Sequence, residues 1–194
     1  MRIAIALTLS LVLAACDAPQ QQPASKAEAP RQVVPFEARS VAGAGRVWQL
    51  SADGVFAQDL ATGARKAVAM PDWQWAAEPY ACMPDLALGP HGEVVVTSNV
   101  LPKLWRIDPL TLAVTVHALE LDADNDKDVG FAGLVYSDLH KSFIAVSQLH
   151  RSLWMIDPQL RRAQKVVLDE INDLSPQQDA AFIRAGCTVT APRS

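Results

Sequence analysis

The sequence predicts an all-β chain built from three four-stranded antiparallel repeats. The first observation is that three stretches superpose without a gap at a spacing of 49 residues: GVFAQDLATGARKAVAM from Gly54, KLWRIDPLTLAVTVHAL from Lys103 and SLWMIDPQLRRAQKVVL from Ser152. The second is that short apolar and β-branched runs with turn residues between them recur inside each repeat. Repeats of this length indicate stacked or radially arranged units.

The second repeat shows its four strands most clearly. Residues 85–89 alternate and stop at a Gly-Pro-His-Gly turn, and residues 93–98 are rich in β-branched side chains. Both are strand signals with a turn between them. Residues 104–108 and 112–119 alternate again and are separated at Pro109, because proline cannot donate to a strand ladder.

The other two repeats follow the same order. The third has expected strands at 133–137, 142–147, 153–157 and 164–168. The first has clear strands at 46–50 and 55–59, whereas its opening strand near residues 37–41 is poor. Equivalent positions hold an aromatic residue (Phe56, Trp105, Trp154), which we expect to pack between repeats, and a turn aspartate (Asp59, Asp108, Asp157). An aspartate there starts a turn by accepting nearby backbone N–H groups.

Four-stranded units of 40 to 50 residues are the blades of β-propellers. The phrases LALGPHGEVVVTS, LWRIDPLTLAV and LWMIDPQL resemble the repeats of the YVTN, NHL and quinoprotein-like propeller superfamily. The resemblance covers roughly residues 36–170 and implies blade geometry. Propellers usually have about four to eight blades, so three copies predict a partial or small propeller with an open edge.

A short C-terminal helix is a candidate cover for that edge. Residues 175–186 begin with a serine N-cap followed by proline at the first helical position, and they end at a glycine. Phe182 and Ile183 would then face the last sheet. A second chain that completes the ring is the other way to cover the open edge.

The N-terminus has the layout of a secretory signal. A short basic start precedes an apolar run, residues 3–14, that is shorter than the roughly 20 residues a membrane helix needs. Leu13-Ala14-Ala15-Cys16 resembles the lipobox of bacterial lipoproteins. The resemblance implies cleavage before Cys16 and acylation of that cysteine, with the chain anchored to either envelope membrane and facing the periplasm.

The predicted organisation follows from these signals. Residues 1–15 are a signal peptide, and residues 16–35 are the lipidated cysteine with a tether rich in proline, glutamine and alanine, which has too little to bury to fold. Residues 36–187 form the repeat domain, with repeats at about 36–84, 85–133 and 134–182. Residues 188–194 are a tail.

Net charge and cysteine content give information on nucleic-acid binding and on disulfide formation. The net charge of −4 and the lack of a lysine or arginine cluster exclude a nucleic-acid footprint. With Cys16 acylated, Cys82 and Cys187 remain, and in an oxidising compartment an even pair predicts a disulfide. Two separate thiols are the alternative.

An acidic loop between the second and third repeats is a candidate calcium site. Asp122, Asp124, Asp126 and Asp128 place carboxylates at alternate positions, as at the start of an EF-hand loop. However, Lys127 stands at the glycine position and Gly133 at the place of the last bidentate glutamate. An acidic, solvated loop is therefore favoured over calcium, and we expect no other cofactor.

No catalytic motif is present in the chain beyond the signal peptide. The sequence favours a non-catalytic binding or assembly module that contacts a protein partner, or another copy of itself, through the open blade edge. The alternative is a quinoprotein-like or lactonase-like propeller enzyme, or an accessory subunit of one. Its plausible site residues are Asp85, His91, Asp138 and His140.

Overall fold

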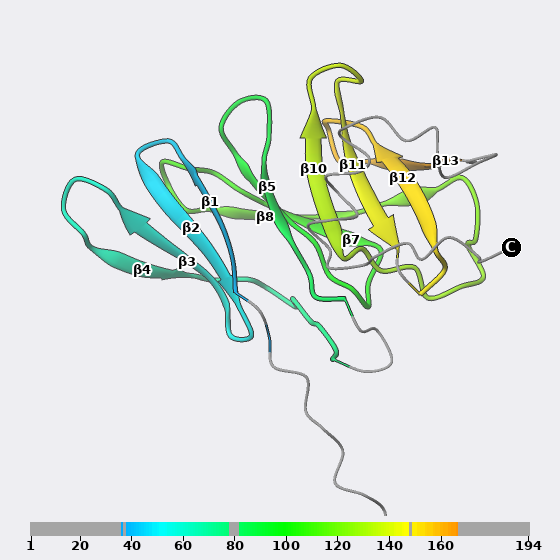
Figure 1. Cartoon of the computed structure of the whole chain (residues 1–194), viewed down its shortest axis with the longest axis horizontal. Coiled ribbons are helices and arrows are strands. Elements are labelled where there is room, and N and C mark those ends of the chain that lie inside the picture. The colour runs from blue at the N-terminus through cyan, green and yellow to red at the C-terminus, as the bar shows by residue number, and fades with distance from the viewer. Residues whose placement is uncertain (1–35, 37, 78–81, 148, 167–194) are drawn as a thin grey trace, which may run out of the picture. The chain divides into compact units, whose positions relative to one another are not determined.

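A computed structural model describes residues 36, 38–77, 82–147 and 149–166 of the chain. All of these residues belong to the compact unit Val33–Ser194. Within the described ranges every regular element is a strand (Figure 1), and no helix there is long and apolar enough to cross a membrane. The helix predicted at residues 175–186 lies outside the described residues.

The described strands form three sheets, which confirms the all-β class and the four-stranded repeat. Their bounds are, for the first sheet, β1 (Arg39–Gly43), β2 (Arg46–Ser51), β3 (Gly54–Asp59) and β4 (Arg65–Val68); for the second, β5 (Leu86–Leu88), β6 (Val94–Val96), β7 (Lys103–Ile107) and β8 (Val114–Ala118); and for the third, β10 (Gly133–Ser137), β11 (Ser142–Ser147), β12 (Ser152–Ile156) and β13 (Arg162–Val166). In each sheet, consecutive strands pair antiparallel.

The third sheet has one strand that the sequence did not predict. The two residues of β9 (Glu120–Leu121) leave the second sheet and pair parallel with β13, with Glu120 opposite Arg162 and Leu121 opposite Ala163. The sheet order is therefore β10-β11-β12-β13-β9. The connection between the second and third repeats thus pairs with the outer strand of the third sheet. Without β9 this edge would be open to pairing with another chain.

Strands β5–β7 of the middle sheet are largely buried on both faces, because successive side chains point to opposite sides and another sheet packs on each side. Trp105 packs with Trp48 and Leu50 of the first sheet, whereas its neighbour Leu104 packs with Phe143 and other side chains of the third. Double-sided burial explains why β6 is the continuous apolar run Val94–Val96, with all three residues fully buried. The core therefore lies in two layers between three sheets.

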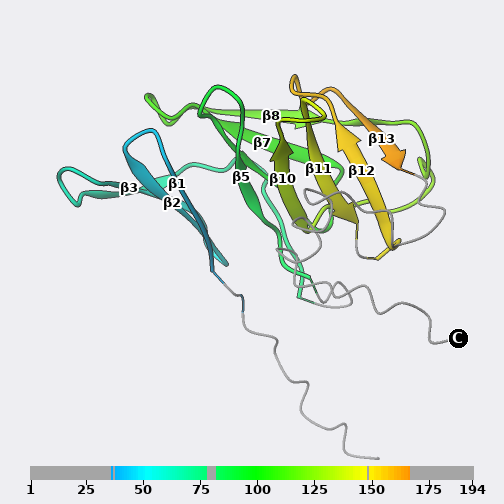
Figure 2. The ribbon, with the colours of Figure 1, turned by 45° about the horizontal axis from the view of Figure 1, so that its top comes forward.

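The inner strands of the three sheets are neighbours. β5 lies between β1 and β10 (Figures 1 and 2). Asp85, just before β5, is fully buried and accepts the backbone N–H of Leu134 in β10 at 3.2 Å. On the other side, a Cβ on Gly43 of β1 would lie 2.6 Å from Leu88 Cδ1, so a larger residue there would require the Leu88 side chain to move.

The turn aspartates act as the sequence predicts. In the first two sheets, Asp59 and Asp108 each accept two backbone N–H groups and a threonine hydroxyl between 2.7 and 3.0 Å. These hydrogen bonds, those from Thr62 and Thr111 first, hold the pKa of both carboxyls below its usual value. In the third, Asp157 accepts the backbone N–H of Gln159 at 2.9 Å. The repeated aspartates are therefore structural.

Candidate functional site

The first sheet carries a face that no described residue covers. In the strand register, residues that alternate with the core positions form the rows Ser40, Gln49, Phe56, Ala67 and Ala42, Val47, Gln58, Arg65. We call these eight residues the outer face of the first sheet. Val47, Gln49 and Phe56 at its centre are half-buried, and the other five residues are exposed.

Phe56 stands at the position of a residue that is core in the other two sheets. Trp105 and Trp154, 49 and 98 residues further on, point toward the preceding sheet and are fully buried. Phe56 points the same way from the first sheet, where no described sheet precedes it. The structure therefore confirms inter-sheet packing for the two tryptophans and shows a different setting for Phe56.

The neighbours of Phe56 differ from those of Trp105 in polarity. Trp105 lies between Val96 and Val116 in its sheet, whereas Phe56 lies between Gln49 and Ala67. In the next row, the second sheet has Val94, Ile107 and Val114, and the first has Val47, Gln58 and Arg65. Around Phe56, Gln49, Gln58 and Arg65 thus stand at positions where the second sheet has apolar side chains.

Arg65 and Gln49 hold the ring of Phe56 in place. The Arg65 guanidinium lies 4.1 Å from the ring centroid, and its Nη2 donates to Gln49 Oε1 at 3.0 Å. A cation over an aromatic face at an exposed site contributes about 0.5–1 kcal/mol. The outer face is therefore an ordered arrangement of an aromatic ring, a cation and an amide.

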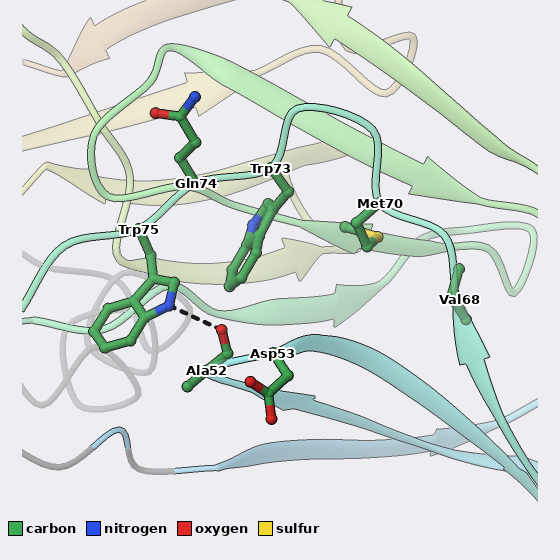
Figure 3. A pocket seen from close by; sticks show the side chains of 7 residues that line it. All are labelled: Ala52, Asp53, Val68, Met70, Trp73, Gln74 and Trp75. Carbon is green, nitrogen blue, oxygen red and sulfur yellow. Dashed lines mark hydrogen bonds between the residues drawn. The ribbon is translucent and has the colours of Figure 1, made fainter.

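A pocket of about 470 Å³ lies at the end of the same sheet, lined by Ala52, Asp53, Val68, Met70, Trp73, Gln74 and Trp75 (Figure 3). Trp75 Nε1 donates to Ala52 O at 3.0 Å, and Trp73 Nε1 donates to Thr97 O at 2.8 Å. The ring of Trp75 also meets Phe36 edge to face at 4.8 Å. Both indoles therefore fasten the connection between the first two sheets. This pocket could not be predicted from the sequence, because the connection between β4 and β5 carries no periodic signal.

In the acidic loop, two of the predicted calcium ligands contact lysines. Asp124 Oδ1 accepts from Lys127 Nζ at 2.7 Å and Oδ2 from Lys165 Nζ at 2.5 Å. These bonds lower the pKa of Asp124 to about 2. Asp122 Oδ1 accepts the backbone N–H of Lys165 at 2.8 Å. The loop thus joins β13 as an extension of β9.

The described residues hold no group of three or more histidine, cysteine, aspartate or glutamate side chains that could bind a metal ion. Asp126 is exposed, and the Asp128 backbone carbonyl faces His150 Nε2 at 2.9 Å. Calcium binding by Asp122, Asp124, Asp126 and Asp128 stays a prediction. It would require Asp124 to exchange both lysines for the cation.

The four residues of the enzyme alternative lie in different settings. Asp85 is buried at the start of β5 and accepts the backbone N–H of Leu86 at 2.8 Å. His91 is exposed in the turn beyond the other end of that strand. Asp138 and His140 are exposed in the β10–β11 turn, where Asp138 lies 3.7 Å from Lys141. Asp85 is therefore at the opposite end of the inner strands from the other three.

The cysteine predictions are placed only in part. Cys82 is buried against Ala132, just before β10, and its carbonyl accepts from Asn99 Nδ2 at 2.9 Å. Cys16 and Cys187 lie outside the described residues. Acylation of Cys16 and pairing of Cys82 with Cys187 stay predictions.

No protein-family model and no curated protein matches this sequence. Solved structures do. Selenomethionine-substituted virginiamycin B lyase from Staphylococcus aureus matches with a TM-score of 0.53 and 13% identity, over 69% of this chain and 42% of the lyase. A catalytically inactive variant of that lyase, with quinupristin, matches with a TM-score of 0.53 and 13% identity, over 75% of this chain and 45% of the lyase.

The chain has a propeller-like fold. The likeness to the lyases, together with three sheets that each contain four consecutive antiparallel strands, shows the architecture that the repeats predict. At 13% identity the likeness concerns the fold alone, and the aligned part spans less than half the length of either lyase chain.

Proposed function

We propose that this chain is a lipid-anchored protein of the bacterial cell envelope whose propeller-like module binds a partner protein through the outer face of the first sheet. One observation carries the proposal: Phe56 occupies a position that packs against a neighbouring sheet in both later repeats, yet Gln49, Gln58 and Arg65 stand near it where the second sheet has apolar residues. A permanent sheet-to-sheet contact would favour apolar neighbours, as around Trp105.

The composition of this face suits a separable protein interface. Such interfaces combine an apolar centre with a polar rim and are enriched in aromatic residues and arginine. Here Phe56 and Val47 form the centre, and Gln49, Gln58 and Arg65 surround it. Arg65 is already held by Phe56 and Gln49, so it loses little freedom on binding.

The partner is a different protein rather than a second copy added head to tail. A head-to-tail contact would set the first sheet's outer face against the far face of the third sheet. In the third sheet, however, the central side chains of that far face are already buried within one chain: Ile144 and Val146 are 0% exposed and Leu153 is 1% exposed. Two copies could still pair symmetrically through the outer faces of their first sheets. The experiment must therefore distinguish such a dimer from a complex with a different protein.

The lipid anchor is supported by the lipobox-like Leu13-Ala14-Ala15-Cys16 and by the tether composition of residues 16–35. An acylated cysteine followed by an extended tether would hold the folded module at the membrane with freedom to reach a partner. The function proposed is therefore assembly at the envelope, without catalysis.

Site-directed photo-crosslinking in cells tests the proposal. A photoreactive residue at Ala67, on the outer face, is compared with one at Leu110, an exposed turn residue of the second sheet. We expect one adduct of defined mass from Ala67 only, and its loss when Phe56→Asp is added. An adduct containing two copies of this chain, or one that survives Phe56→Asp, would overturn the proposal.

A propeller enzyme of the quinoprotein or lactonase type, or an accessory subunit of one, is the alternative. The matched virginiamycin B lyase is an enzyme by its name, which is the observation that favours this class. The structure leaves Asp85 apart from His91, Asp138 and His140. Metal analysis and mass spectrometry of the purified full chain decide between the two classes, because a stoichiometric metal or quinone would favour the enzyme.

A further inference from the structure

The third sheet has an apolar face directed away from the other two sheets. On β11 and β12, Phe143, Ala145, Trp154 and Ile156 point toward the second sheet, and the residues between them point the opposite way. We define the outer face of the third sheet by the side chains that form this separate cluster: Val135, Ile144, Val146, Leu153, Met155 and Val166.

The centre of this face is inaccessible to solvent. Ile144 and Val146 are 0% exposed and Leu153 is 1% exposed. All six members of the cluster belong to β10–β13, and no described residue of another sheet is among them. A fully buried centre needs a cover, and this apolar cluster contains no described residue from outside the sheet that could supply one.

We infer that the C-terminal segment 175–187 of the same chain covers the outer face of the third sheet. Residues 167–194 follow β13 directly, so they start at the sheet that needs the cover. They also carry large apolar side chains: Phe182 and Ile183 belong to segment 175–187, and Val167, Leu168, Ile171 and Leu174 come between β13 and that segment in the sequence. Burying such side chains is favourable because it removes apolar surface from water.

The other segments outside the described ranges are poorer candidates. Residues 78–81 are four residues long, and position 148 is a single residue. In the tether, residues 16–35, the large aliphatic side chains are limited to Val33 and Val34. The apolar run at residues 3–14 belongs to the predicted signal peptide, which cleavage before Cys16 would remove.

Cys82 lies where such a cover could be fastened. It is buried against Ala132, next to the first residue of β10, the inner strand of the third sheet. A bond from Cys82 to Cys187 would hold the end of the segment beside this strand. The loop closed by that bond, about 100 residues, is of a length for which the chain-entropy model gives a large restriction of the unfolded state.

The consequence is an array with one open end. The chain itself closes the third sheet, and the first sheet keeps its outer face for a partner. This assignment rests on the burial of Ile144, Val146 and Leu153, and not on the proposed function. The two proposals share this burial only in the argument against a head-to-tail second copy, so binding through Phe56 can fail while the cover holds.

Photo-crosslinking within the purified full chain tests the contact directly. A photoreactive residue at position 182 is compared with one at Gln177, which would lie on the opposite side of the predicted helix. We expect the probe at Phe182 to crosslink to peptides from residues 142–156 of the same chain, and the probe at Gln177 to give at least tenfold less of that product. Crosslinks from position 182 to the first or second sheet, or to a second chain, would overturn the inference.

Two further measurements guard against misfolded variants. In the unmodified protein, peptide mapping without reduction is expected to join Cys82 to Cys187, and free thiols on both would overturn the proposed fastening. Hydrogen exchange of Phe182→Asp is expected to be faster than that of Gln177→Asp in β11 and β12, with β2 and β3 unchanged in both. Equal protection of β11 and β12 in the two variants would count against the cover.

Discussion

The guanidinium of Arg65 lies 4.1 Å from the ring centroid of Phe56, on the outer face of the first sheet. In the second and third sheets, the residues equivalent to Phe56 are tryptophans that are buried against a neighbouring sheet. The same repeat position thus serves as core twice and as a half-buried surface residue once. Arg65 provides in the first sheet part of the cover that a neighbouring sheet provides in the others.

This difference predicts unequal costs for two equivalent truncations. Trp105→Ala should lower the free energy of unfolding by about 3–5 kcal/mol, because it removes a fully buried aromatic side chain. Phe56→Ala should lower it by about 1 kcal/mol, a value typical of a single substitution outside the core. Urea unfolding of both purified variants measures the two losses, and equal losses would show that Phe56 is also core.

The Asp124–Lys165 ion pair predicts a specific acid sensitivity. Because the pKa of Asp124 is lowered to about 2 in the folded chain, its contribution to stability is present above the ordinary carboxyl pKa of about 3.9 and is lost as the pH falls toward 2. Asp124→Asn should therefore flatten the fall in melting temperature over this range. Asp138→Asn is the matched control, since its side chain is 93% exposed, and a similar flattening in it would refute the assignment.

The histidine in β8 predicts a separate effect nearer neutral pH. Burial, and then the charge of Arg106, hold the pKa of His117 below its usual value. The folded chain therefore binds the proton less readily than the unfolded chain, and stability should decline as the pH falls below about 6.5. His117→Gln should remove part of this decline, whereas His91→Gln, in an exposed turn, should leave it in place.

Calcium gives a clear test of the acidic loop. Since Asp124 contacts both Lys127 and Lys165, we expect the melting temperature to be the same in excess calcium and in EDTA. A calcium-dependent rise that disappears in Asp126→Asn would show instead that the four aspartates bind the ion, because a ligand of the folded state alone stabilises it.

Anchoring depends on one side chain. Cys16→Ser should move the protein from the membrane fraction to the soluble fraction and abolish incorporation of a labelled fatty acid. Cys187→Ser should leave both properties unchanged. Retention of the Cys16→Ser variant in the membrane fraction after a salt wash would contradict acylation as the anchor.

The repeats predicted most of the described fold because strand alternation and turn residues are local signals. The three sheets, the turn role of Asp108 and the burial of Trp105 and Trp154 all follow from residues close in sequence. β9 could not be found this way, since two residues give no periodicity and its pairing with β13 is a distant contact.

Less of the candidate site could be predicted from the sequence. Alignment at 49 residues makes Phe56, Trp105 and Trp154 look alike, and only their places in the array separate them. Likewise, Trp73 and Trp75 line a pocket through bonds to Thr97 and Ala52, which no local pattern specifies. The calcium hypothesis rested on spacing alone and could not anticipate Lys165, which lies 41 residues from Asp124.

The central claim is that the outer face of the first sheet binds a partner protein. The most direct measurement is the affinity of the crosslinked partner, once purified, for three forms of the full chain: unchanged, Phe56→Asp and Leu110→Asp. We predict that Phe56→Asp weakens binding at least tenfold, a change of about 1.4 kcal/mol, while Leu110→Asp, whose parent side chain is 80% exposed elsewhere, binds as the unchanged chain does. Equal affinity of all three forms would contradict the account.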